Sequence, residues 1–306
     1  MHVFDVISVG HFAIDSIFLP DRQTPFVVLG GSVAYVSFAA RRLDATVSVV
    51  SKVGGDFPEA YLWWLRQEGI DLSGVVKVEN VRTTRFELKY RSDLSSRSLQ
   101  LKSRAPPITV DDLPKYLSAK AVHIGPIAGE IAYDVAEKLR NCAEVLSLDP
   151  QGLVRNFDQN GNVTHGSLTD ERILELVNIY KSSSEEIKAV TGLSDLSSAV
   201  KAVHNYGVEL VIVTSGMEGA VLSMEETLYN IPAYRSVKVV DPTGAGDVFI
   251  GGFLAEYVRG EDALRCACVG SAVASLVVEA VGPTFLGEKV EVYRRARLLY
   301  EKEIKG

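Results

Sequence analysis

Short apolar runs rich in β-branched residues alternate with segments of helical period along most of the chain, and this alternation restricts the fold more than any other feature. Strands that are apolar on both faces and separated by helices are typical of a parallel, doubly wound sheet with helices on both sides. We therefore predict a three-layer α/β/α fold around a mainly parallel sheet. The helix over 58–67 is expected to turn Trp63, Trp64 and Leu65 to its apolar side. The expected strands are residues 3–9, 46–53, 121–124, 145–148, 177–180 and 210–214, and the expected helices are residues 32–43, 58–67, 131–140, 170–176 and 196–206, with 246–304 almost wholly helical.

Residues 84–103 break this rhythm and have the pattern of a β-hairpin. Apolar and charged side chains alternate on both sides of a turn at Ser92 and Asp93, which leaves the hairpin with one apolar face. Two strands alone are marginal in water, so this face needs cover. We expect the cover from short strands at 17–19 and 26–29, or from the same ribbon of a second subunit in a homodimer. The residues of the apolar face are Phe86, Leu88, Tyr90, Leu99 and Leu101.

No linker, repeat or low-complexity tract divides the chain. We therefore expect residues 1–306 to form a single domain with a small inserted β lid, contributed by about 16–29 and 84–103.

Charge and composition exclude several classes of partner. The 306 residues carry 32 Lys and Arg against 39 Asp and Glu, a formal net charge of -7, and no basic stripe, so nucleic acid is not expected. The N-terminal residues lack a signal-peptide pattern, and the longest apolar stretches, 33–40 and 272–278, are too short to cross a bilayer. We therefore expect a cytoplasmic protein with no membrane partner. The 3 cysteines and 5 histidines show neither Cys-x-x-Cys nor metal-ligand spacing, so a disulfide framework and a zinc site are not expected.

The most informative motif is Asp-Pro-Thr-Gly-Ala-Gly-Asp at residues 241–247, which follows the apolar run 237–240 and precedes a helix expected to start at about Asp247. Glycines at a helix start let backbone N–H groups converge on one anion, and the helix dipole adds to their attraction. An acid beside such an anion hole is unfavourable unless it takes a proton from the group that attacks a phosphate. A helix N-cap is the plainer interpretation of Asp247, and the complete motif disfavours it.

Two better-known glycine motifs do not fit. A dinucleotide-binding fingerprint would need Gly in place of Phe249 and a position after the first strand. A Walker-type loop, with Lys and Ser or Thr after its last Gly, is found nowhere in the sequence. A nicotinamide oxidoreductase and a P-loop enzyme are therefore disfavoured.

Residues 241–247 resemble the second signature of the ribokinase-like (PfkB) carbohydrate kinase family, and the resemblance covers nearly the whole chain. It implies a three-layer body with a β lid, ATP as donor, Mg²⁺ as cofactor and a sugar-like acceptor. It also implies that Asp247 is the general base and that the backbone N–H groups of Gly244, Ala245 and Gly246 hold the transferring phosphoryl group. Thr243, in the same signature, is expected to contact the nucleotide.

The acceptor side of the family pattern is found mainly near the N-terminus. Gly10 and Asp15 resemble the family's opening motif, in which the acid accepts hydrogen bonds from the acceptor's hydroxyls. Without the resemblance, Asp15 could equally be an acidic residue in an exposed loop. Gly30-Gly31 resembles the first signature, in which paired glycines let the substrate approach the backbone. That signature usually carries Asn where this chain has Tyr35, which disfavours a plain ribose pocket and resembles inositol-kinase-like members. Gln151, after another expected strand, is a further candidate for acceptor contact.

The donor side of the pattern is less complete. Thr214, Gly216 and Gly219 follow the expected strand 210–214 and resemble the family's turn against the ATP phosphates. Glu186 fits the acid of an Asn-x-x-Glu motif that orders Mg²⁺ through water, but Ser183 replaces the Asn. A helix N-terminus capped by Ser explains the same residues and is compatible with that role.

These residues together predict ATP-dependent phosphorylation of a hydroxyl on a small sugar or polyol, as in a sugar or inositol kinase. A nucleoside kinase of the same family is the main alternative. A non-catalytic sensor of sugars or nucleotides on the same fold is a second alternative, which Tyr35 and Ser183 motivate and the intact motif at 241–247 opposes.

Overall fold

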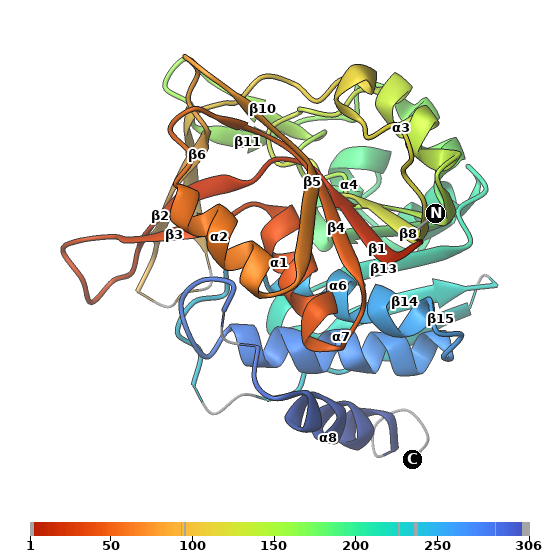
Figure 1. Ribbon diagram of the computed structural model, residues 1–306. Helices are drawn as coiled ribbons and strands as arrows, with labels where there is room; N and C mark the ends of the chain where they lie inside the picture. The colour runs from red at the N-terminus through yellow and green to blue at the C-terminus, as the bar shows by residue number, and fades with distance from the viewer. Residues whose placement is uncertain are drawn as a thin grey trace.

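The computed structural model describes residues 3–92, 94, 96–225, 227–235, 238–284 and 286–301. The strands of its main sheet are β1 (Phe4–Val9), β4 (Val47–Gly54), β5 (Ile70–Val78), β8 (Ala119–Ile124), β9 (Ala143–Leu148), β12 (Ile179–Ser183), β13 (Leu210–Thr214), β14 (Ala220–Met224) and β15 (Thr227–Ile231). Within the described residues these strands form one sheet in the order β15-β14-β13-β12-β9-β8-β1-β4-β5 (Figure 1). The strands from β13 to β5 are parallel, and β14 and β15 continue the sheet as an antiparallel edge.

Helices cover both faces of this sheet. One face carries α1 (Ser32–Arg42), α2 (Glu59–Gln67), α6 (Ala245–Tyr257) and α7 (Ala263–Val277), and α8 (Lys289–Leu299) packs outside α7 (Figure 1). The other face carries α3 (Tyr133–Arg140), α4 (Ser184–Thr191) and α5 (Leu196–His204). Short 3-10 helices connect other elements: η1 (Val110–Asp112), η2 (Glu171–Leu176) and η3 (Gly216–Glu218).

The strands are apolar on both faces because the sheet separates two hydrophobic cores. In β13, Leu210 and Ile212 belong to the core beneath α1, α6 and α7, whereas Val211 and Val213 belong to the core beneath α3, α4 and α5. Each such buried side chain contributes about 1.5–3 kcal/mol relative to an exposed one. The predicted three-layer α/β/α fold is confirmed.

Several elements differ from the sequence expectation. The pattern does not predict β5, β14 or β15, because these strands lie at or next to the sheet edges, where polar residues such as Asp71 and Asn230 interrupt the apolar run. Trp63, expected on the apolar side of its helix, is 63% exposed, since α2 buries Leu62 and Leu65 instead. The helix expected over 170–176 is the 3-10 helix η2.

The C-terminal region is mainly helical as expected, but residues 258–262, and residues 278–284 and 286–288, divide it into α6, α7 and α8. Residues 302–304 of the expected helical region lie outside the described residues. In the part of the chain that the structure describes, α7 and every other helix fall short of the length and apolar character that crossing a bilayer requires.

A smaller sheet lies beside the main one, in the order β3-β2-β6-β7 (Figure 1). Its strands are β2 (Ala13–Phe18), β3 (Phe26–Gly30), β6 (Thr84–Tyr90) and β7 (Arg97–Ser103). β6 and β7 form the expected antiparallel hairpin, with Leu88 opposite Leu99; Asp93 of the expected turn lies outside the described residues.

The N-terminal strands do not cover the apolar face of this hairpin, contrary to expectation. β2 pairs with β6 edge to edge and in parallel, so it extends the sheet. The apolar face instead packs against Ile127 and Ala128 of the main body. The residues from the short hairpin of β10 (Arg155–Phe157) and β11 (Val163–His165) that join this cluster are Phe157 and Val163. The small sheet therefore packs on the main body through Ile127 and Ala128, which follow the carboxyl end of β8.

Candidate active site

The carboxyl ends of the parallel strands meet at one edge of the main sheet, where ligands bind in folds of this type. A cleft of about 1190 Å³, here called the large cleft, opens at this edge beside the start of α6. A cavity of about 50 Å³, here called the small cavity, adjoins it beneath the small sheet. The residues that line both are Arg97, Leu99, Gln151, Arg155, Gly244 and Asp247.

The residues of the predicted anion hole lie at the start of α6. Gly244 is the N-cap and has φ +76, in the left-handed region, so a side chain there would be strained. A Cβ on Gly244 would also lie 2.2 Å from the ring of Tyr35. The helix begins at Ala245, two residues before the expected start. Residues 238–240 of the preceding apolar run form no strand, and Val237 lies outside the described residues. The N-cap interpretation of Asp247 is therefore wrong, because Gly244 occupies the cap and Asp247 lies within the first turn.

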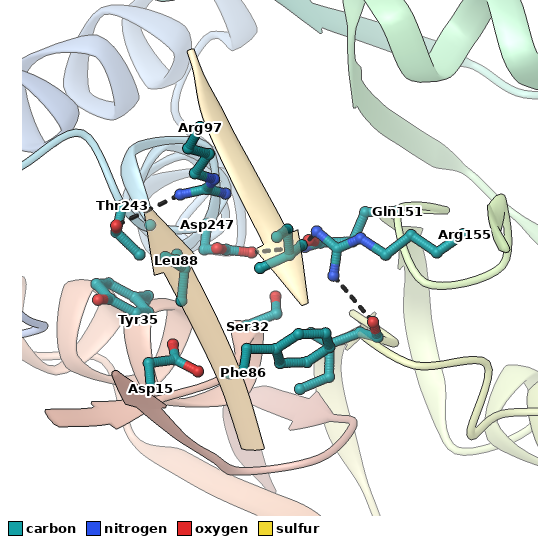
Figure 2. A pocket seen from close by; sticks show the side chains of 14 residues that line it. Asp15, Ser32, Tyr35, Phe86, Leu88, Arg97, Gln151, Arg155, Thr243 and Asp247 are labelled. Carbon is teal, nitrogen blue, oxygen red and sulfur yellow. Dashed lines mark hydrogen bonds between the residues drawn. The ribbon is translucent and has the colours of Figure 1, made fainter. Parts of the chain in front are cut away.

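Asp247 is oriented by a chain of hydrogen bonds between the two hollows (Figure 2). Gln151 Nε2 donates to Asp247 Oδ1 at 3.2 Å, and Arg155 Nη2 donates to Gln151 Oε1 at 2.7 Å. Arg155 Nη1 donates to the carbonyl oxygen of Ile127 at 2.9 Å, which fixes the guanidinium to the body. Asp247 Oδ2 accepts no hydrogen bond from the described residues, so it is free to contact a ligand.

The small cavity is lined by three residues with a buried polar atom that has no hydrogen-bond partner in the described part of the chain. These atoms are Asp15 Oδ1, Ser32 Oγ and Tyr35 OH. Native structures rarely leave such groups unsatisfied, and a ligand is one explanation for each exception. Asp15 lies on β2 and is only 6% exposed, which contradicts the interpretation as an exposed loop acid.

The charge of Asp15 is controlled by its surroundings. Burial raises the pKa of its carboxyl group to about 7, against the attraction of Arg97 and Arg155, and the nearby Asp241 and Asp247 raise it further. Near neutral pH, Asp15 is therefore divided between its protonated and ionised forms.

The paired glycines shape the small cavity in different ways. A Cβ on Gly30 would lie 1.9 Å from Asp15 Oδ2, so this glycine makes room for the carboxylate and does not itself line the cavity. Gly31 does line it, with φ +89, and a Cβ there would lie 2.3 Å from the carbonyl oxygen of His11. Of the other residues expected on the acceptor side, Tyr35 lines the small cavity and Gln151 lines both hollows.

Thr243 connects the small sheet to the loop before α6. Its Oγ1 donates to Asp241 Oδ1 at 2.6 Å and is 2.8 Å from the hydroxyl of Tyr90 on β6. Arg97 on β7 donates to the same Tyr90 hydroxyl at 2.6 Å. Arg97 also donates to Thr243 Oγ1 at 3.4 Å (Figure 2). Thr243, expected at the nucleotide, lines the small cavity.

The other residues expected to contact the donor line the large cleft or the hollow next to it. Thr214 and Gly216 line the large cleft beside Ala245 and Gly246. A further hollow of about 550 Å³, here called the apolar pocket, shares these residues and also includes Gly219. Its remaining lining is mainly apolar or aromatic, and includes Ala233, Tyr234, Phe249, Ala274 and Val278.

Glu186 and Ser183 form the helix start that the sequence indicates. Ser183 is the N-cap of α4, and Glu186 Oε2 accepts from the Ser183 backbone N at 2.7 Å and from its hydroxyl at 2.8 Å. Burial opposes ionisation of Glu186, but Lys181 and these hydrogen bonds outweigh it and lower its pKa. Glu186 is therefore a carboxylate at neutral pH, on the wall of the large cleft.

The residues fit a Mg²⁺ ion held mainly by water and phosphate. No group of three His, Cys, Asp or Glu side chains able to enclose a metal is found among the described residues. Mg²⁺ keeps much of its water and is usually bound through one or two carboxylates plus substrate phosphates. Glu186 Oε1 accepts from no described residue and so remains available to a metal-bound water.

Sequence reasoning missed a buried ion pair at this site. Lys181 of β12 donates from Nζ to Asp149 Oδ2 at 2.6 Å, and both residues line the large cleft. It also missed Ser32, Tyr90 and Arg97. The available signal for Lys181 was a lysine inside an otherwise buried strand; Arg97 shows no such signal, because the hairpin carries many basic residues.

Comparison with known proteins agrees with this geometry. Residues 4–289 match the family described as "pfkB family carbohydrate kinase". A cytidine kinase from Thermococcus kodakarensis is 30% identical over 88% of this chain and 94% of its own length, and an inositol 3-kinase from Arabidopsis thaliana is 29% identical over 95% of this chain and 80% of its own. Among solved structures, a pyrophosphate-dependent kinase in the ribokinase family, complexed with a pyrophosphate analog and myo-inositol, has a TM-score of 0.81 at 25% identity, covering 94% of this chain and 99% of that one. The chain therefore belongs to the pfkB family of carbohydrate kinases and is a phosphotransferase of the sugar, inositol or nucleoside kinase type.

Proposed function

We propose that this protein transfers the γ-phosphoryl group of ATP to a hydroxyl of a small sugar or cyclic polyol. The observation that carries the proposal is the position of Asp247, which lines both the small cavity and the large cleft at the start of α6. A carboxylate at that junction reaches an acceptor on one side and a phosphate on the other.

The acceptor binds in the small cavity. Asp15, Ser32 and Tyr35 offer their unpartnered polar atoms to its hydroxyls, while Phe86, Leu88 and Leu99 of the small sheet form an apolar wall against its C–H face. An ionised carboxylate accepts several hydroxyl hydrogen bonds, each stronger than a neutral pair.

Transfer takes place at the start of α6. Asp247 accepts the proton of the attacking hydroxyl, and the backbone N–H groups of Gly244, Ala245 and Gly246 stabilise the charge on the transferring group. Mg²⁺, when bound, neutralises phosphate charge, and Glu186 is positioned to hold it through water. The small sheet, closed over the cavity, excludes water that would otherwise compete as acceptor.

The apolar pocket favours a nucleotide donor over pyrophosphate. One structural relative is a pyrophosphate-dependent kinase. In this chain, the apolar pocket of about 550 Å³ extends from the anion hole between Tyr234, Phe249 and Val278, and a nucleobase provides the apolar surface to fill it. We expect ATP to support turnover and pyrophosphate to support little or none, measured with the same acceptor.

The small cavity favours a compact acceptor over a nucleoside. Tyr35 lines this cavity and fills the space beside Gly244, where a larger acceptor would otherwise extend. The relative named cytidine kinase keeps nucleosides as the second candidate, and the relative named inositol 3-kinase supports a cyclic polyol. A panel of inositols, sugars and nucleosides, each assayed for ATP-dependent product formation, distinguishes these candidates.

Replacing the proposed base tests the chemistry directly. We expect Asp247→Asn to bind ATP as the unmodified protein does and to lose turnover by about 10²–10⁴-fold, because the hydroxyl proton then has no acceptor. Unchanged kcat in this variant contradicts the role of Asp247. Ligand binding without turnover for every acceptor in the panel would instead favour the sensor alternative.

A further inference from the structure

The proposed mechanism gives no role to the ammonium of Lys181, which lines the large cleft. Its side chain is 5% exposed and that of its partner Asp149 is 1% exposed, with 2.6 Å between Nζ and Oδ2. Taking two charges out of water is unfavourable, and replacing such a pair by well-packed apolar residues is often neutral or stabilising. Stability alone is therefore a weak explanation for the pair.

The ammonium lies directly against the anion hole. A Cβ on Gly246 would lie 2.6 Å from Lys181 Nζ, which places the charge over the first turn of α6. Lys181, Gly246 and Asp247 all line the large cleft. Any phosphate bound by the N–H groups of this turn is therefore within the range of the Lys181 charge.

Lys181 also has hydrogen-bonding capacity to spare. An ammonium carries three N–H donors, and Asp149 is the one acceptor that Nζ contacts among the described residues. Burial opposes its charge, but the attraction of Asp149, Asp247 and Glu186 outweighs burial and raises the pKa of Lys181. The group thus remains a cation, with donors available to an oxygen in the cleft.

One turn of the chain anchors both this cation and the proposed base. Asp149 Oδ1 accepts from the backbone N of Gln151 at 3.1 Å, which fixes the carboxylate that holds Lys181. The side chain of Gln151 in turn donates to Asp247. The turn over 149–151 therefore sets the position of the cation relative to the base.

We infer that Lys181 is a catalytic residue that donates a hydrogen bond to a non-bridging oxygen of the transferring phosphoryl group, and that Asp149 is the positioning residue that holds it there. The inference rests on the proposed function. In the step, the acceptor oxygen bonds to the γ-phosphorus, the bond from phosphorus to the β,γ-bridging oxygen breaks, and the hydroxyl proton goes to Asp247. Lys181 remains protonated throughout and forms no covalent bond. Its charge offsets the repulsion that Asp149, Glu186 and Asp247 would otherwise exert on an incoming anion.

Removing both members of the pair separates this role from a structural one. Lys181→Met alone leaves Asp149 buried without its partner, so it is expected to lower both Tm and kcat. In Lys181→Met/Asp149→Asn, no charge is left unpaired, and we expect Tm to return to within a few degrees of the original value while kcat stays at least 100-fold lower. Recovery of kcat to within threefold, together with Tm, would overturn the inference.

A binding measurement gives a readout that does not depend on turnover. We expect the double variant to lose at least tenfold of the preference for ATP over ADP, measured by calorimetry, because the contact is made to the γ-phosphoryl group. An unchanged preference would also overturn the inference. If the double variant does not fold, Lys181→Arg is compared instead, because it keeps the charge but not the compact ammonium. A fall of tenfold or more in kcat at unchanged Tm would support the inference. Full kcat with an unchanged preference for ATP would count against it.

A matched pair outside the cleft provides the control. Lys52 and Asp112 are also 2.6 Å apart, with side chains 11% and 15% exposed, and neither lines the large cleft or the small cavity. Lys52→Met/Asp112→Asn should leave kcat and the ATP preference unchanged. Absence of turnover in the unmodified protein with every acceptor would refute the proposed function instead, which is a different outcome from any of those above.

Discussion

Asp15 shows how a single residue links protonation to ligand binding. The fold buries its carboxylate, leaves Oδ1 without a partner among the described residues, and raises its pKa to about 7. The ionised form accepts hydrogen bonds from hydroxyls, whereas the protonated form has lost part of that capacity. Acceptor binding should therefore depend on pH in a range where an ordinary aspartate is fully ionised.

We expect the affinity for the acceptor, measured without donor, to rise about tenfold between pH 6 and pH 8. The sign follows from the direction of the shift, because a raised pKa means that the carboxylate becomes predominant only above about pH 7. Calorimetric titration at the two pH values measures the effect. Asp15→Asn is the control and should bind weakly with no such pH dependence; an equally steep dependence in that variant would assign it to another group.

At the scale of one element, the start of α6 combines backbone geometry with close packing. Gly244 needs a positive φ and also has the ring of Tyr35 where a Cβ would be. The proposed anion hole and the wall of the small cavity are thus in direct contact at one glycine.

We expect Gly244→Ala to reduce kcat by at least 100-fold and to lower Tm, because the new methyl group must displace Tyr35 or the turn itself. Gly192 is a matched control: it ends α4 with φ +69, and a Cβ there meets nothing within 4 Å. Gly192→Ala should lower the free energy of unfolding by roughly 1 kcal/mol through the same backbone strain, and so lower Tm, while kcat stays unchanged. Equal losses of kcat in both variants would mean that the effect of Gly244→Ala is global destabilisation.

At the scale of the whole molecule, the fold was more predictable from sequence than the site. The sequence predicts buried strands such as β13 because their residues are apolar on both faces. It does not predict β5 and β15, because they carry the polar residues of a sheet edge. The sequence predicts Asp247 and its glycines as site residues because they are contiguous in the chain. It does not predict Arg97 and Lys181, because separate strands bring them to the site and no local pattern records that meeting.

The contact between the small sheet and the body is also a property of the whole molecule. Tyr90 and Thr243 are 153 positions apart in the chain, and the 2.8 Å contact between their hydroxyls connects β6 to the loop before α6. We expect Tyr90→Phe to weaken closure, which would lower kcat for transfer about three- to tenfold and raise the rate of ATP hydrolysis without acceptor. Product and ADP formation, measured in parallel, give both rates. Tyr116→Phe is the control, since Tyr116 is 72% exposed. If Tyr90→Phe leaves the ratio of transfer to ATP hydrolysis unchanged, this contact does not govern closure.

The division of the small cavity between two sheets has an evolutionary consequence. Phe86, Leu88 and Leu99, which line the small cavity from β6 and β7, are separate from the body residues proposed to move the proton and the phosphate. Exchanging side chains on this hairpin can alter which molecule is recognised and leave the reaction itself intact. Substitutions confined to the hairpin of β6 and β7 can therefore change acceptor specificity during evolution. This gives a physical reason why relatives of this chain are named for acceptors as different as cytidine and inositol.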